Sequence, residues 1–191
     1  ATLDASTEGS GAGGTLFINV DNFSANSGAQ VRTRTSGSGD AGTIVVNVND
    51  ALLLSDIGTG FFADTTIGST GNGGNISINN ARFVRSDTVQ IANGAVLDAS
   101  TAGSGAGGSV LLGTHNFSAT SGGQLRTRTS GSGAAGNIVV GALDSFVISD
   151  AGTGLFADTT SGSSGIGGSI IVNTDTFQVT NGAVLDASTA G

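Results

Sequence analysis

Short runs of alternating apolar and polar residues, separated by glycine-rich segments, make up the whole chain. Residues 3–7 (LDAST) place apolar or small side chains at odd positions and polar ones at the second and fourth, and this period of two predicts a strand. A second apolar run over residues 15–18 follows a loop of Gly, Ser and Ala, and a third centres on Phe23. Because no segment shows the 3.6-residue apolar spacing of a helix, we expect units of three short strands joined by glycine corners.

These units repeat along the sequence. The motif at residues 3–7 returns at 97–101 and again at 185–189. A finer repeat of about 30 residues is marked by a glycine that opens each new unit: Gly28, Gly58, Gly94, Gly122, Gly152 and Gly182. Three units make the longer repeat, so we expect two three-coil super-repeats over residues 1–93 and 94–181 and the start of a further coil at 182–191. One unit carries an insertion of about six residues around Arg82 to Thr88.

Strands of about five residues cannot each bury a face alone, whereas a coiled chain lets every strand pair with its equivalent one unit on, about 4.8 Å away. We therefore predict an all-β, right-handed parallel β-helix, a solenoid of about six coils and a single continuous segment over residues 1–191. Stacking in register would align equivalent side chains in inward columns, the first of which is Leu3, Val31, Phe61, Leu97, Leu125, Leu155 and Leu185.

The outward positions of the first strand carry charges whose signs alternate from unit to unit. Stacking would juxtapose Asp4 with Arg32, Arg34 with Asp64, Asp98 with Arg126, and Arg128 with Asp158. Each pair is worth about 0–1 kcal/mol if exposed, and the set would fix the register of the coils. Phe62 and Phe156 would be outward aromatic residues flanked by arginine, either in cation–π contact or as part of a contact with another molecule.

The second strand is apolar on both faces, although a strand with one face in water normally alternates with polar residues. An apolar stripe of this kind indicates a self-association face or a surface covered by a loop, such as the insertion. Its outward row, which with Phe62 and Phe156 forms the predicted contact face, is Phe17, Val45, Leu111, Val139 and Ile171, interrupted by Ser77.

The composition of the chain argues against several classes of function. The chain has 34 glycines, no Pro, Cys, Met, Trp, Tyr or Lys, and a net charge of −8, which disfavours binding to nucleic acid or to an anionic membrane. No apolar run approaches the ~20 residues of a membrane helix. The single histidine, His115, has no partner pattern for a catalytic triad. We expect no catalytic, cofactor-binding or metal-binding residues, and therefore no enzyme.

The repeats resemble those of large secreted proteins of the filamentous haemagglutinin family, especially the cyanobacterial forms. The matching text is GNGGNISIN at residues 71–79 and NGAVLDAST at 93–101 and 181–189, with weaker copies at 26–35 and 120–129. The resemblance implies a right-handed parallel β-helix that is exported by a two-partner pathway and displayed outside the cell in adhesion, aggregation or biofilm formation.

We therefore expect a structural segment of a longer, exported protein, located at the cell surface as an adhesin or extracellular filament. Its expected partners are copies of itself, associated end to end or laterally, and a surface glycan or protein receptor. One alternative is an ice- or glycan-binding solenoid module with an outward Thr-x-Thr array. A less favoured one is a polysaccharide lyase-like enzyme using Arg32, Arg34 and Asp64.

Overall fold

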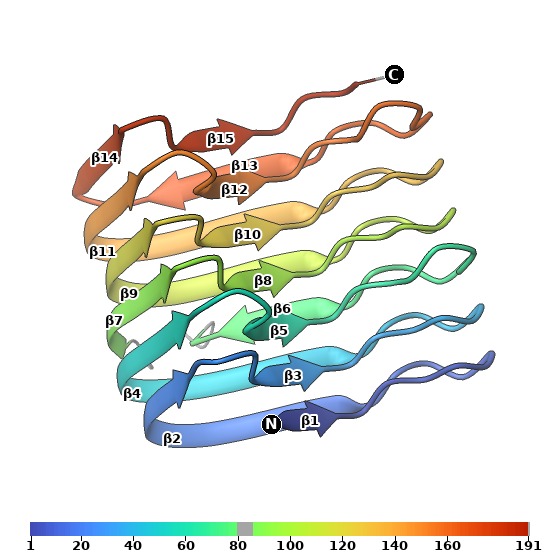
Figure 1. The fold of residues 1–191 in the computed structure, drawn as a ribbon, viewed down its shortest axis with the longest axis horizontal. Helices are drawn as coiled ribbons and strands as arrows, with labels where there is room; N and C mark the ends of the chain where they lie inside the picture. The colour runs from blue at the N-terminus through green and yellow to red at the C-terminus, as the bar shows by residue number, and fades with distance from the viewer. Residues whose placement is uncertain (80–85, 191) are drawn as a thin grey trace.

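The computed structural model describes residues 1–79 and 86–190, and most of the expected insertion around residues 82–88 lies outside this range. The described chain forms a parallel β-solenoid of about six turns of about 30 residues each. In Figure 1 the chain runs to the right across the front, returns to the left behind and climbs one level per turn, which makes the coil right-handed.

One wall of the solenoid, the short-strand sheet, holds seven three-residue strands that pair in parallel in the order of the coils. Its strands are β1 (Thr2–Asp4), β3 (Gln30–Arg32), β5 (Gly60–Phe62), β8 (Val96–Asp98), β10 (Gln124–Arg126), β12 (Gly154–Phe156) and β15 (Val184–Asp186). The register is that expected from the repeats, since Leu3 pairs with Val31, Val31 with Phe61, and Phe61 with Leu97.

The opposite wall, the long-strand sheet, joins the second and third expected strands into one bent strand in four of the coils. The register of the pairing shifts at the bend, between Val20 and Asn22 and between Ala142 and Ser145. The chain therefore changes direction there while the parallel pairing continues on both sides of the bend. Its strands are β2 (Thr15–Ala25), β4 (Thr43–Ser55), β6 (Asn75–Ile78), β7 (Ser86–Ala92), β9 (Ser109–Thr120), β11 (Asn137–Ser149), β13 (Ser169–Asn173) and β14 (Thr176–Thr180).

The core lies between the two walls and consists of stacked like side chains. Phe61, Leu97 and Leu125 of the short-strand sheet are fully buried, as are Ile44 and Ile76 of the long-strand sheet. Rings also stack at one edge, with 5.1 Å between the centroids of Phe117 and Phe146 and 5.2 Å between those of Phe146 and Phe177.

Glycine determines the two kinds of connection. The six glycines that open the units all have positive φ, from 77° at Gly28 to 85° at Gly122, a conformation that side chains with a Cβ rarely adopt. On the other side, the Gly, Ser and Ala loops run out from the short-strand sheet and return to the long-strand sheet, forming a glycine-rich lobe at the right of Figure 1. Coils in this lobe lie so close that a Cβ on Gly108 would be 1.7 Å from the carbonyl oxygen of Gly74.

Candidate binding and assembly surfaces

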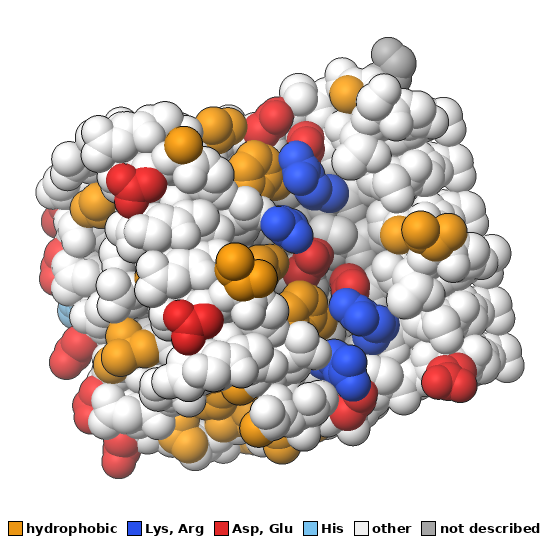
Figure 2. All heavy atoms as spheres, viewed as in Figure 1, with side chains coloured by type: hydrophobic (Ala, Val, Ile, Leu, Met, Phe, Trp, Pro, Cys, Tyr) orange, Lys and Arg blue, Asp and Glu red, His pale blue; other side chains and the backbone are white. Residues whose placement is uncertain are grey.

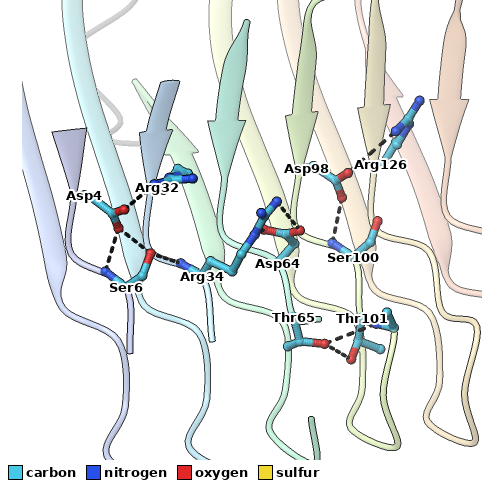
Figure 3. A network of polar contacts seen from close by, with 11 residues as sticks. Asp4, Ser6, Arg32, Arg34, Asp64, Thr65, Asp98, Ser100, Thr101 and Arg126 are labelled. Carbon is cyan, nitrogen blue, oxygen red and sulfur yellow. Dashed lines mark hydrogen bonds and ion pairs between the residues drawn. The ribbon is translucent and has the colours of Figure 1, made fainter. Parts of the chain in front are cut away.

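The expected charge ladder lies on the outer face of the short-strand sheet. Backbone pairing stacks Asp4 on Arg32, Arg32 on Phe62 and Phe62 on Asp98. The same order then repeats from Asp98 through Arg126 and Phe156 to Asp186. Two residues beyond the end of each short strand, a second column runs from Ser6 through Arg34 to Asp64 and repeats as Ser100, Arg128 and Asp158. Figure 3 shows part of the two columns, with Asp4, Arg32, Asp98 and Arg126 in the first and Ser6, Arg34, Asp64 and Ser100 in the second.

Each arginine of the ladder contacts the aspartate expected to be its partner. The nitrogen–oxygen distance is 2.5 Å for Arg32 and Asp4 and 3.7 Å for Arg126 and Asp98. The Nε of Arg126 donates to the Gln124 side chain at 2.6 Å. The pairs in the second column are bidentate: Arg34 Nε and Nη2 both donate to Asp64 at 2.8 Å, and Arg128 Nε and Nη2 donate to Asp158 at 2.6 and 2.8 Å.

The two outward phenylalanines lie under these bidentate arginines. The Arg34 guanidinium carbon is 5.6 Å from the centroid of the Phe62 ring, and that of Arg128 is 4.6 Å from the Phe156 ring. These distances fit the cation–π interpretation of the two residues. Each arginine is therefore held by a carboxylate at its edge and by a ring against its face.

Burial and hydrogen bonding act in opposite directions on the acids of the ladder. Burial raises the pKa of Asp64, aided by the nearby Asp98 carboxylate, and outweighs the lowering effect of the hydrogen bonds from Arg34. At Arg34 the hydrogen bond to Asp64 is the larger effect and raises the pKa, because its side chain is more exposed than that of Asp64. Asp4 is exposed, and hydrogen bonds from Ser6 lower its pKa.

The serine of the second column has a structural role that the sequence reasoning missed. Ser6 Oγ accepts the backbone N–H of Arg34 at 3.0 Å, and Ser100 Oγ accepts that of Arg128 at 3.1 Å. Asp98 in turn accepts the backbone N–H of Ser100 at 3.0 Å. The sequence does contain a signal for this role, because Asp and Ser recur two residues apart in each Asp-Ala-Ser segment. Side chains of these two types commonly form hydrogen bonds with nearby backbone.

The apolar stripe lies on the outer face of the long-strand sheet, in register from coil to coil. The pairing runs from Phe17 to Val45, through Ser77 to Leu111, and on to Val139 and Ile171. Phe17 is 60% exposed and Ile171 49%, whereas the three members between them are partly buried. Phe62 and Phe156, which the prediction grouped with this stripe, lie on the opposite wall, so the structure does not bring the seven residues into one face.

Other candidate groups do not form a site. Thr33, Thr35, Thr127 and Thr129 are fully buried, so they do not form the outward array that the ice-binding alternative requires. His115 Nδ1 lies 3.4 Å from Asp144 Oδ2 at the bend where β9 pairs with β11, and both side chains are exposed. Among the residues that the structure describes, there is no group of three or more His, Cys, Asp or Glu arranged to hold a metal ion. Over the same residues, no helix is long and apolar enough to cross a membrane.

Comparison of the chain with protein-family models, curated proteins and solved structures gives no match.

Proposed function

We propose that this chain is a structural segment of an extracellular adhesin or surface fibre, and that its long-strand sheet associates side by side with another copy. The proposal rests on the solenoid architecture and on the likeness of the repeats to filamentous haemagglutinin-type proteins. A rod of stacked coils presents long, regular walls, and about 30 Å of such wall is available here from the strand spacing. Regular walls suit adhesion and assembly because the same contact is repeated along the axis.

The observation that carries the proposal is the apolar stripe. Inward residues of the long-strand sheet already fill the core, so the outward Phe17, Val45, Leu111, Val139 and Ile171 add nothing to it. A row of outward apolar residues in register is costly in water and is typical of an association surface. A second copy with the same stripe supplies a matching apolar partner, which favours lateral pairing.

Two charge-bearing double variants test this surface. Leu111→Glu with Val139→Glu places adjacent charges in the stripe and should abolish lateral association in sedimentation velocity and electron micrographs. Ser118→Glu with Val147→Glu is the matched control, because these residues also pair outward on β9 and β11 but lie beyond the bend. The proposal is contradicted if the protein is monomeric at all concentrations, or if both double variants assemble like the unmodified chain.

Cell-surface location is tested separately. Antibody raised against residues 1–191 should label intact cells of the source organism in immunogold micrographs without permeabilisation. Labelling that appears only after permeabilisation would contradict an extracellular location and leave the association test unaffected.

A further inference from the structure

Two similar hollows lie on the face that carries the charge ladder. Figure 2 shows this face, with the arginine and acidic side chains in a band between the glycine-rich lobe and the rest of the surface. One hollow is lined by Asp4, Ser6, Thr7, Glu8, Arg32, Arg34, Ser36 and Thr66. The other is lined by Asp64, Thr65, Asp98, Ser100, Thr101, Ala102, Arg126, Arg128, Ser130 and Thr160.

The two hollows are copies of one another. Each residue that lines the first has its counterpart, 94 positions later, in the lining of the second. Seven of the eight counterparts are the same residue type, and the one difference is Glu8, which is replaced by Ala102. Three coils separate the copies, which corresponds to about 14 Å along the axis. A linear molecule lying along the band would therefore meet the same set of groups twice.

The charges in each hollow balance. The first contains two arginines and the carboxylates of Asp4 and Glu8, and the second contains two arginines and the carboxylates of Asp64 and Asp98. Serine and threonine supply most of the remaining lining. A balanced set of donors and acceptors suits a neutral, hydroxyl-bearing ligand, while the net charge of −8 disfavours polyanions.

The arginines are held in place before any ligand arrives. Asp64 accepts two of the five N–H groups of Arg34, and the Phe62 ring lies against the guanidinium face. Asp158 and Phe156 hold Arg128 in the same way. The remaining three N–H groups of each guanidinium can donate to a ligand without the loss of side-chain freedom that binding normally entails.

We propose that this band binds a neutral oligosaccharide chain along the solenoid axis, with one equivalent subsite in each hollow. The inference rests on the proposed adhesive function and deepens it by naming a class of receptor. The hydroxyls of the sugar chain accept from Arg34 and Arg128 and donate to the carboxylates of Asp4 and Asp98. Because the two subsites are linked rigidly, a chain long enough to reach both binds more tightly than one that fills a single subsite.

The test measures binding of neutral oligosaccharides of increasing length by isothermal titration calorimetry, with uronate-containing oligosaccharides as a second arm. Ser36→Phe and Ser130→Phe place a bulky ring at the exposed rim of each hollow. Ser38→Phe and Ser132→Phe are the matched controls, because both are exposed on the same loops and line neither hollow.

We expect short neutral oligosaccharides to bind with two sites per chain, and either blocking variant to leave one. A longer oligosaccharide should bind at least about tenfold more tightly, and a single block should remove that gain. The double block should abolish binding, while the double control keeps it. Circular dichroism shows whether each variant remains folded.

The inference is overturned if no neutral oligosaccharide binds, if only the uronate-containing ones bind, or if the double block binds as well as its control. None of these results affects the lateral association tested with Leu111→Glu and Val139→Glu. Conversely, a chain that binds oligosaccharide but never associates would contradict the assembly proposal alone.

Discussion

The same five-residue motif, LDAST, has two different environments in this molecule. At residues 3–7 its leucine, Leu3, is 53% exposed, whereas at 97–101 the equivalent Leu97 is fully buried. Leu97 lies between Phe61 and Leu125, on β5 and β10. Leu3, in the outermost described coil, pairs with Val31 alone. Burial in this fold is therefore determined by the neighbouring coils and not by the motif, and stability depends on contacts between stacked coils.

The glycines two residues after these two copies of the motif, Gly9 and Gly103, also differ in their surroundings. A Cβ on Gly9 would meet no atom within 4 Å, whereas one on Gly103 would lie 1.8 Å from the backbone carbonyl oxygen of Ser69. The coil beneath Gly103 makes this contact, and no described residue lies beneath Gly9. Identical local sequence carries very different constraints.

The largest effect is expected from Gly103→Ala. Its new methyl group overlaps backbone that cannot move without disturbing the adjacent coil, so we expect a loss of at least about 4 kcal/mol in the free energy of unfolding, or failure to fold. Gly9→Ala, the matched change, should lie within about 0.5 kcal/mol of the unmodified chain when both are measured on residues 1–191 alone. Urea denaturation followed by circular dichroism measures both. Equal effects of the two substitutions would contradict the stacking argument.

Removal of the buried leucine comes next. Leu97→Ala leaves a cavity between two coils and should cost about 3 kcal/mol in the free energy of unfolding. Leu3→Ala removes a half-exposed side chain and should cost less than about 1 kcal/mol. The same denaturation experiment applies, and a Leu3→Ala variant as unstable as Leu97→Ala would show that the outer coil is packed like an inner one.

The ion pairs extend the comparison to charged groups. Arg128→Met leaves the Asp158 carboxylate, 8% exposed, without its bidentate partner, and we expect a loss of about 2 kcal/mol in the free energy of unfolding. Arg32→Met leaves Asp4, 37% exposed, in contact with water, and should cost about 0–1 kcal/mol. Denaturation in low and high salt separates the two pairs, since salt should weaken only the contribution of the exposed one. A larger loss for Arg32→Met would refute this ordering.

The regularity of the ladder explains how much of the molecule could be predicted. Repeats place Asp4 beside Arg32 and Phe17 beside Val45 as soon as the coils are stacked in register, so the charge pairs and the stripe follow from spacing alone. The joining of the second and third strands could not be foreseen, because polar bend residues such as Asp21 read as a loop although the ladder continues past them.

The hollows were equally hidden from sequence reasoning. They depend on how far the glycine-rich lobe stands from the charged columns, which is a property of loop geometry and not of periodicity. Ser36 follows Arg34 by two residues, whereas Thr66 comes from the loop of the next coil, and the structure brings Thr66 into the same hollow. The burial of Asp64, which raises its pKa, likewise depends on its surroundings in three dimensions.

The smallest predicted effect is a difference in pH dependence between Asp64 and Asp4. The pKa of Asp64 is raised by folding, so protonation favours the folded state and its contribution to stability grows as the pH falls through the raised pKa. The pKa of Asp4 is lowered by folding, so its contribution is present above the ordinary value of about 4 and is lost as the pH falls further.

Urea denaturation of Asp64→Asn and Asp4→Asn at neutral and acidic pH checks these signs. The free energy of unfolding of Asp64→Asn, relative to that of the unmodified chain, should be highest at neutral pH and should fall as the pH is lowered. That of Asp4→Asn should change in the opposite direction. Parallel pH profiles for the two variants would contradict the assigned directions.

The most direct test of the central claim, that neighbouring coils and not the motif determine order, is hydrogen–deuterium exchange of the 191-residue chain read by mass spectrometry. Peptides covering residues 1–9 and 95–103 contain the same LDAST motif and therefore have nearly equal intrinsic exchange rates. We predict slow exchange at 97–101 and much faster exchange at 3–7, because an outer coil opens without disrupting the rest. Equal protection of the two copies would contradict the account.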